Sequence, residues 1–334
     1  MHATARRRAL LGASALLPAT AFLGPRRAAR AQGDAAWPTR PVRIVVPFPA
    51  AGTTDLLARI LADALGTRLG QPVVVENRTG SSGNIGMENV VRSAPDGHSL
   101  LMGTTGALTV NPHLFPNLGF DPARDLAPVS LVFTTDSALI VNPNMPAQTV
   151  AEFLALARSR PGAFSFGSAG AGSSTHMAAE LFRLAAGIQV LHVPYRGSAP
   201  ALNDTVAGNV QFMVDQLPSC IGQIRAGQVR ALAVTGPRRS PLLPEVPTVA
   251  EAGLPGAEST SWGAVLVPAG TPDTAVERLG AAVREALAVP AVKERMAQAG
   301  ADAASSSPAE LAEIMRRDAE RWGKVVKEAR ISVG

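Results

Sequence analysis

The chain has 334 residues, of which 46% are hydrophobic and 17% are charged, and its formal net charge is +5. This length exceeds what one hydrophobic core usually serves, so we expect two structural units. A single cysteine excludes an internal disulfide. Three lysines and one tyrosine are few for a protein that neutralises phosphates and stacks on bases, which disfavours nucleic-acid binding.

The first 31 residues have the features of a cleaved export signal. Arginines at positions 6–8 precede an apolar run at 9–23, and residues 29–31 offer a small-x-small cleavage site. The run is too short to span a membrane. Residues 7–11 fit a twin-arginine pattern, but ordinary signals also carry paired arginines, so the export route stays open. Cleavage at residue 31 would leave 303 residues with 25 basic and 26 acidic side chains, so we predict no nucleic-acid partner.

A strand, a loop of small residues and a helix follow one another near the start of the remaining chain. Residues 42–46 are apolar, two prolines in the loop at 47–55 cannot continue a sheet, and apolar residues then recur at helical spacing. Gly52 lets the backbone approach a ligand, and Thr53, Thr54 or Asp55 can cap the helix. The N–H groups at a helix start favour an anion. The competing interpretation is an ordinary connection in an α/β domain.

A second loop of the same kind occurs about 120 residues later. Residues 164–168 predict a strand, 169–174 a turn rich in glycine and hydroxyl groups, and 175–187 a helix. Neither loop has the lysine of a phosphate-binding Walker loop, and the second fails the dinucleotide fingerprint at Thr175. No serine has the flanking glycines of a nucleophile elbow, which disfavours an exported hydrolase. The ligand that remains compatible with both loops is a small anion, held by backbone amides and hydroxyl groups.

The rest of the chain alternates short apolar strands with helices, which predicts an α/β fold. Helix starts are indicated by Thr149 with Glu152 as a capping box, by Thr271 with Pro272 at the first helical position, and by Ser307 with Glu310. Further strands are expected at 72–76, 99–104, 138–142, 190–193, 211–215, 230–235 and 264–268.

Metal and acid–base chemistry have little support in the sequence. The histidines at 98, 113, 176 and 192 form no pair at metal-ligand spacing, so we predict neither a metal nor a cofactor. Asp55 and Asp215 follow strands in different parts of the chain, so their expected role is orientation of loop amides or acceptance of a ligand hydrogen bond. Arg78 is expected to be a solvated loop residue rather than a carboxylate clamp, and His176 a packing residue or one that supports a ligand-contacting residue.

Several motifs in a fixed order resemble those of the Bug receptors, the periplasmic substrate-binding proteins of tripartite tricarboxylate transporters. The resemblance spans nearly all of the predicted mature chain. Two departures, Ala51 where glycine is more common and Gln216 where asparagine is usual, leave the ligand's identity open. The motifs are residues 47–55, 75–78, 83–86, 94–97, 174–176, 192–197 and 245–248.

The resemblance implies a two-lobed, type II-like periplasmic binding protein. Each lobe would be a doubly wound sheet with flanking helices, and the ligand would lie in the cleft between them. Lobe 1 is predicted at 32–137 and 264–334, and lobe 2 at 138–263. The chain would cross between the lobes near 136–141 and 262–268, which makes a hinge.

The function implied is that of a periplasmic receptor, not an enzyme. It would close on a small organic carboxylate and deliver this ligand to the membrane permease subunits of a tripartite transporter, and we expect a monomer. An orphan sensor for a signalling partner is the alternative. The predicted ligand-binding residues are Phe48, Pro49, Ala50, Ala51, Gly52, Thr53, Asp55, Gly83, Asn84, Thr104, Thr105, Ser168, Gly172, Ser173, Ser174, Thr175 and Asp215.

Overall fold

The computed structural model describes residues 37–332, so the predicted signal at 1–31 lies outside the described part. Two sheets share one long strand, β4 (Leu126–Val141). The first sheet has the order β2-β1-β3-β9-β4 and the second β4-β7-β5-β6, while β10 and β8 also pair with β4. The other strands are β1 (Val42–Val46), β2 (Val73–Asn77), β3 (Ser99–Thr104), β5 (Phe164–Ser168), β6 (Val190–Pro194), β7 (Phe212–Gln216), β8 (Arg230–Val234), β9 (Thr260–Pro268) and β10 (Asp302–Ala303).

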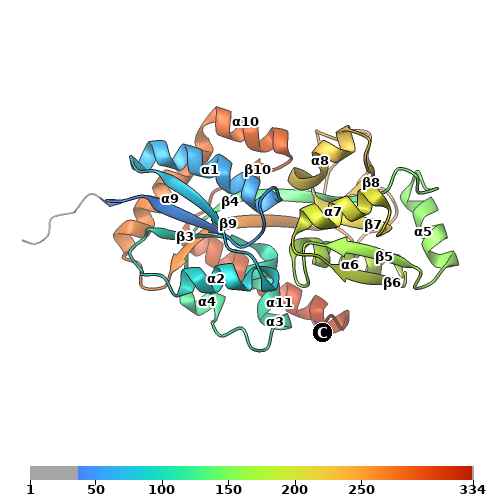
Figure 1. The fold of residues 1–334 in the computed structure, drawn as a ribbon, viewed down its shortest axis with the longest axis horizontal. Helices are drawn as coiled ribbons and strands as arrows, with labels where there is room; N and C mark the ends of the chain where they lie inside the picture. The colour runs from blue at the N-terminus through green and yellow to red at the C-terminus, as the bar shows by residue number, and fades with distance from the viewer. Residues whose placement is uncertain (1–36, 333–334) are drawn as a thin grey trace, which may run out of the picture. The chain divides into compact units, whose positions relative to one another are not determined.

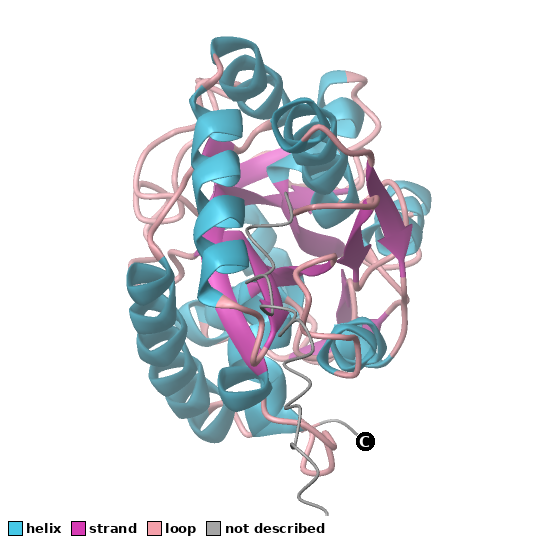
Figure 2. Ribbon diagram, turned by 90° about the vertical axis from the view of Figure 1, so that its left-hand side faces the viewer, coloured by secondary structure: helices cyan, strands magenta, loops and turns pink. Residues whose placement is uncertain are grey.

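Helices cover the strands, which lie between them in Figure 2. Two short irregular segments, a 3₁₀ turn at Ser81–Gly83 and a π-helical turn at Gly106–Val110, precede helices in the first half. The helices are α1 (Thr53–Leu69), α2 (Asn84–Val91), α3 (Asn111–Leu114), α4 (Pro122–Asp125), α5 (Val150–Ser159), α6 (Ser174–Ala186), α7 (Ser198–Ala207), α8 (Leu217–Arg225), α9 (Asp273–Ala288), α10 (Pro290–Ala299) and α11 (Pro308–Glu328).

The two sheets repeat one winding pattern. β1 is parallel to both β2 and β3, and β5 is parallel to both β6 and β7. β1 therefore lies between β2 and β3, and β5 lies between β6 and β7, so each sheet is doubly wound. Ligands of such sheets bind at the carboxyl ends of the strands where the order reverses. For this chain these are the ends of β1 and β5.

Strand β4 joins the two sheets and β9 runs beside it, across the middle of Figure 1. From Leu126 to Asp136 β4 pairs with β9, and from Ser137 to Val141 it pairs with β7. The fold is therefore the predicted two-lobed α/β fold, with lobe 1 built on the first sheet and lobe 2 on the second. The predicted lobe limits at 137/138 and 263/264 fall inside β4 and β9 and stay a prediction.

Each lobe has its own apolar core. Lobe 2 buries Phe153, Phe182 and Phe212, with the rings of Phe153 and Phe212 edge to face at 5.2 Å between centroids. Lobe 1 packs Leu311 of α11 against strands β1, β3 and β9. A further cluster joins α6 of lobe 2 to α11 through Met177 and Trp322.

Some predicted boundaries need correction. β4 begins at Leu126 and β9 at Thr260, earlier than the predicted 138 and 264. The Ser307 capping box is confirmed, but the Glu152 carboxylate accepts from the Gln148 N–H, so only the Thr149 cap of the other predicted box is present. The Thr271 prediction is wrong, because α9 begins at Asp273 and the Thr271 hydroxyl donates to the Pro268 carbonyl.

Candidate functional site

A pocket lies where strand ends of the two lobes face each other. Its walls come from the loops after β1 and β5, the ends of β3 and β7, and the first turns of helices. Its free volume is about 30 Å³. Every lining residue is uncharged. They are Phe48, Pro49, Ala50, Gly52, Thr53, Thr54, Thr104, Ala169, Ser173, Ser174, Thr175, Ser198, Ala199 and Gln216.

Three helices, α1, α6 and α7, begin at this pocket. The first N–H groups of a helix have no partner within it, and the helix dipole adds partial positive charge there. Within residues 37–332 these groups have no other acceptor either, so the pocket can hold an anion without a cationic side chain. They are the N–H groups of Thr53, Thr54, Ser174, Thr175, Ser198 and Ala199.

Asp55 fixes the first loop from outside the pocket. Its carboxylate accepts from the Arg59 guanidinium at 2.9 and 3.0 Å, from the Ala51 N–H at 3.1 Å and from the Asn77 side chain at 2.9 Å. The Asn77 amide also donates to the Phe48 carbonyl. Burial alone would raise the pKa of Asp55, but the hydrogen bonds from Arg59, Asn77 and Ala51 lower it below its usual value. The loop is therefore held by an ionised carboxylate.

The backbone of this loop departs from the expectation. Gly52 takes the N-cap position of α1, so none of the three predicted caps does, and no side chain caps this helix start. Gly52 is extended at φ −88°, whereas Ala51 has φ +66°. A left-handed conformation costs a residue with a Cβ about 1–2 kcal/mol. The position that favours glycine is therefore Ala51.

Hydroxyl groups organise the second loop. The Ser173 hydroxyl accepts from the His176 N–H at 3.3 Å and donates to the Gly170 carbonyl at 2.6 Å. The Thr175 hydroxyl accepts from the Ala169 N–H at 2.9 Å. Ser173 is thus the N-cap of α6, which leaves the next two N–H groups of the helix free.

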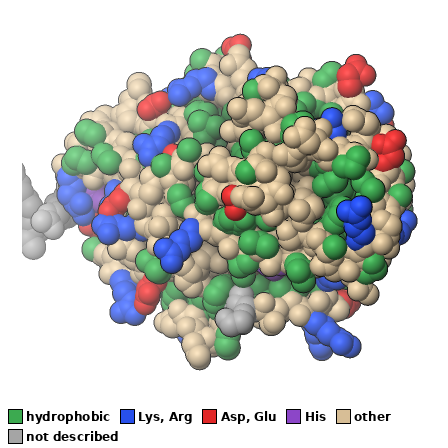
Figure 3. Space-filling view, turned by 45° about the vertical axis from the view of Figure 1, so that its right-hand side comes forward, with side chains coloured by type: hydrophobic (Ala, Val, Ile, Leu, Met, Phe, Trp, Pro, Cys, Tyr) green, Lys and Arg blue, Asp and Glu red, His purple; other side chains and the backbone are tan. Residues whose placement is uncertain are grey.

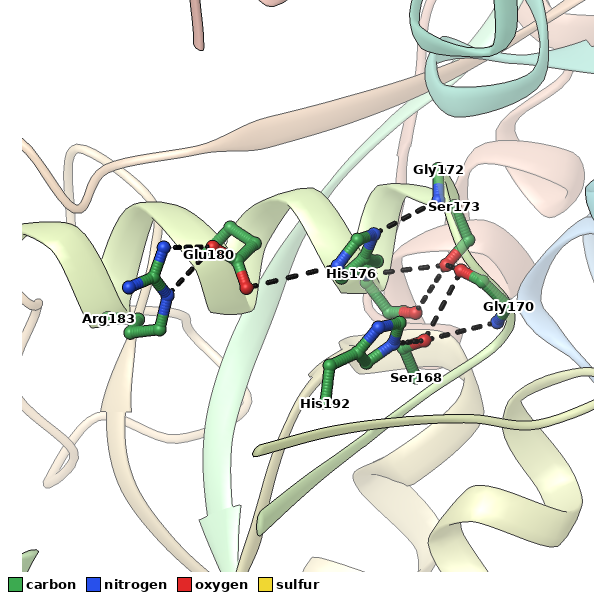
Figure 4. A network of polar contacts seen from close by, with 9 residues as sticks. Ser168, Gly170, Gly172, Ser173, His176, Glu180, Arg183 and His192 are labelled. Carbon is green, nitrogen blue, oxygen red and sulfur yellow. Dashed lines mark hydrogen bonds and ion pairs between the residues drawn. The ribbon is translucent and has the colours of Figure 1, made fainter. Parts of the chain in front are cut away.

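Two histidines pack beneath this loop, in the network of Figure 4. The Ser168 hydroxyl lies 2.6 Å from His192 Nε2, and the rings of His176 and His192 stack at 3.8 Å. Burial lowers the pKa of His176 to about 3 and that of His192 to about 4, so both are neutral near pH 7. No carboxylate among residues 37–332 hydrogen bonds to His192, so Ser168 and His192 lack the third member of a catalytic triad.

Asp215 lies behind the start of α7. Its side chain is fully buried and accepts from the hydroxyl groups of Ser198 at 3.0 Å and Ser219 at 2.5 Å. Burial raises the pKa of Asp215 to about 6 against the effect of these hydrogen bonds. Asp215 therefore orients the pocket residue Ser198. Cys220 is buried nearby, and burial raises the pKa of its thiol.

The lobes contact each other beside the pocket. The Gly106 N–H donates to the Ser174 hydroxyl at 3.3 Å. A Cβ at Gly197 would lie 2.9 Å from the Pro49 ring, and one at Gly170 would lie 3.1 Å from the Ser82 hydroxyl. Both glycines have positive φ. The backbone of lobe 2 therefore comes close to lobe 1 at two loops.

The structure brings many of the predicted ligand-binding residues to this pocket. Those that line it are Phe48, Pro49, Ala50, Gly52, Thr53, Thr104, Ser173, Ser174 and Thr175. Those that do not are Ala51, Asp55, Gly83, Asn84, Thr105, Ser168, Gly172 and Asp215. Asn84 and Thr105 instead serve the scaffold of lobe 1, through hydrogen bonds to Asn111 and Trp262.

Five lining residues were not predicted: Thr54, Ala169, Ser198, Ala199 and Gln216. A signal for the third helix start was present, because Gly197 precedes small residues and Pro200, a proline in a first turn. Arg78, the predicted solvated arginine, forms an ion pair with Glu76 and is half exposed.

Residues 37–332 lack the features of two other kinds of site. Within them, no group of three or more His, Cys, Asp and Glu side chains could hold a metal ion. No helix of this part combines the length and apolarity needed to cross a bilayer. Acidic and basic side chains are interspersed over the face shown in Figure 3.

Comparisons with known proteins agree with this fold and pocket. The family model described as "Tripartite tricarboxylate transporter family receptor" matches residues 57–331. Protein BugT of Bordetella pertussis is 38% identical over 293 residues, which cover 87% of this chain and 90% of BugT.

Two solved structures are similar over nearly their whole length. An R. palustris protein with adipate is 38% identical, with a TM-score of 0.86, and the match covers 89% of this chain and 99% of that one. MatC from Rhodopseudomonas palustris with bound malate is 34% identical, with a TM-score of 0.82 and coverage of 86% and 99%. The chain therefore belongs to the Bug family of tripartite tricarboxylate transporter receptors, which bind solutes and are not enzymes.

Proposed function

We propose that this protein is a periplasmic receptor that closes on a small organic carboxylate in the pocket between its lobes. The observation that carries the proposal is the convergence of three helix starts on a pocket lined only by uncharged residues. Free N–H groups at such starts stabilise negative charge. We propose that the residues lining the pocket contact the ligand. The predicted residues Asp55 and Asp215 support the pocket from behind, through hydrogen bonds to Ala51 and Ser198.

The affinity can be estimated from these groups. A hydrogen bond to a charged oxygen contributes about 1.5–3 kcal/mol, and a helix start adds about 0.3–1 kcal/mol. Four to six such bonds give about 6–18 kcal/mol against an association cost of about 4–15 kcal/mol, a balance that brackets the −8 kcal/mol of micromolar affinity. The Ser174 hydroxyl adds a further donor at the ligand, because it accepts from the Gly106 N–H and its own proton is not used in a hydrogen bond within residues 37–332.

The ligand class follows from the relatives. Adipate and malate, which the two similar structures hold, are small dicarboxylates without a cationic group. An uncharged pocket rich in amide donors suits such anions. We therefore propose a small organic acid as the ligand, and Gln216 and Ala51 as positions that bear on which acid is preferred.

Closure would follow from contacts in both lobes. Thr53 belongs to lobe 1, and Ser174 and Ser198 belong to lobe 2, so a ligand that bridges them favours the closed arrangement. We propose the lobe limits of the sequence prediction, 32–137 with 264–334 and 138–263. The hinge would be the two crossings at β4 and β9.

Export and delivery complete the proposal. The signal at 1–31 would direct the chain to the periplasm and be cleaved, and the mature monomer would present its ligand to permease subunits of a tripartite transporter. Deletion of the permease genes should abolish uptake of the ligand if the partner is a transporter. Intact uptake with a lost transcriptional response in a receptor deletion would indicate the sensor alternative instead.

Calorimetry on residues 32–334 tests the binding step. Adipate, malate and related acids are compared with their uncharged diamides, which keep length and shape but lose the negative charge. We expect micromolar binding of at least one acid and at least a hundredfold weaker binding of its diamide. Equal affinity for acid and diamide, or no binding of any carboxylate, would contradict the proposal.

A further inference from the structure

A second chamber adjoins the pocket at the mouth of the cleft. Its free volume is about 420 Å³, and it shares Phe48, Pro49 and Ala169 with the inner pocket. Its other walls are the loops that follow β2 and β6, residues 79–83 and 195–197. The two chambers therefore share a wall, and both lie between the same two lobes.

The outer chamber differs from the inner one in charge. Arg196 is the single charged residue in the lining of either chamber. Within residues 37–332 it has no ion pair or side-chain hydrogen bond, and it is exposed. Asp204 accepts from the hydroxyl of Tyr195, the residue before Arg196, and Glu76, on the strand before the opposite loop, pairs with Arg43 and Arg78.

The backbone of Arg196 lies close to the inner pocket. Arg196 is two residues before Ser198, which lines the inner pocket, so their Cα atoms are at most about 7.6 Å apart. The wall opposite is the loop with Ser81 at φ +45° and Ser82 at φ +53°, a conformation that is uncommon for residues other than glycine. Such strained positions are concentrated at ligand sites.

The outer chamber has an apolar side as well as a positive charge. Phe48, Pro47 and Ile85 give it an apolar side, and the Arg196 guanidinium gives it one positive pole. A guanidinium matches a carboxylate with two parallel hydrogen bonds. A ligand held by one carboxylate at the helix starts would place an apolar chain along Phe48 and a second acidic group toward Arg196.

We propose that Arg196 and the outer chamber form a second subsite, which takes the distal carboxylate of a dicarboxylic acid with an apolar spacer. The inference rests on the proposed function, because the first carboxylate is assigned to the inner pocket. It makes Arg196 the residue that distinguishes dicarboxylates from monocarboxylates. The inner pocket then sets affinity for a carboxylate as such.

The test is the ratio of two affinities. Straight-chain dicarboxylates of about four to eight carbons and the monocarboxylates of the same lengths are titrated by calorimetry into the parent protein, Arg196→Gln and Arg278→Gln. Arg278 is an exposed arginine on α9 that lines neither chamber, so its variant controls for net charge. The parent and the Arg278→Gln variant should prefer the dicarboxylate of the best length by about tenfold or more.

In Arg196→Gln this ratio should fall to about one, and Arg196→Lys should give an intermediate ratio because it keeps the charge but loses the paired hydrogen bonds. An unchanged ratio in Arg196→Gln would overturn the inference, even if both affinities fell together, since that result indicates only attraction of anions to the cleft. Failure of every acid to bind the parent protein would instead contradict the proposed function itself.

Discussion

Replacement of Asp215 by asparagine should remove a pH dependence of stability that the structure assigns to this side chain. The carboxyl is fully buried and burial raises its pKa to about 6 from an ordinary value of 3.8. The folded state therefore binds this proton more tightly than the unfolded state does. A shift of about two units corresponds to about 3 kcal/mol.

The sign follows from proton linkage. Between about pH 4 and pH 6 the folded protein holds more protons at Asp215 than the unfolded chain, so stability falls as the pH rises through this window. Below about pH 4 the carboxyl is neutral in both states and the penalty vanishes. Asparagine keeps the shape and an acceptor for Ser198 or Ser219, but it does not ionise.

Urea unfolding at a series of pH values from 4 to 7.5 measures the effect. The free energy of unfolding of Asp215→Asn, relative to the parent, should become more favourable by up to about 3 kcal/mol between pH 4 and pH 7. Carboxylates with lowered pKa values, such as Asp55, are present in both proteins and cancel in the difference. Parallel pH profiles for the two proteins would refute the assignment of a buried, ionising carboxylate.

Three further substitutions separate binding from scaffolding. Ser174→Ala removes a hydroxyl that lines the pocket and accepts from the Gly106 N–H, so carboxylate affinity should fall about five- to thirtyfold by calorimetry with nearly the same melting temperature; unchanged affinity would remove Ser174 from the site. Ser173→Ala deletes the α6 cap, so stability to urea should fall by about 0.5–2 kcal/mol, and an undiminished stability would show that the cap contributes nothing. Ala51→Gly relieves a positive φ but adds freedom to the unfolded chain, so denaturation should show a gain of up to about 1 kcal/mol, whereas a loss would show that the strain is absent.

The loops after β1 and β5 were predictable because their signals are local. An apolar strand, a break of prolines or glycines and a helix periodicity lie within a few residues of one another, as at 42–65 and 164–187. The part of β4 before residue 138 gave no such signal, because the polar residues at 134–136 interrupt its apolar pattern. Those residues pair with β9, far along the chain, so only tertiary structure makes them a strand.

The roles of individual site residues were less predictable for the same reason. Asp55 was expected as a cap or a ligand contact, and its actual partners include Asn77 on a different strand. Asp215 was expected at the ligand, but the packing of α7 and α8 buries it behind Ser198. Residue type indicated that these carboxylates matter, and only the packing shows which group each one holds.

A structure of the protein with a bound carboxylate tests the central claim most directly. We predict carboxylate oxygens within hydrogen-bond distance of backbone N–H groups from both lobes, with Thr53 or Thr54 on one side and Ser174 or Thr175 on the other. A ligand bound outside this pocket, or held by one lobe alone with no N–H of a helix start in reach, would contradict it.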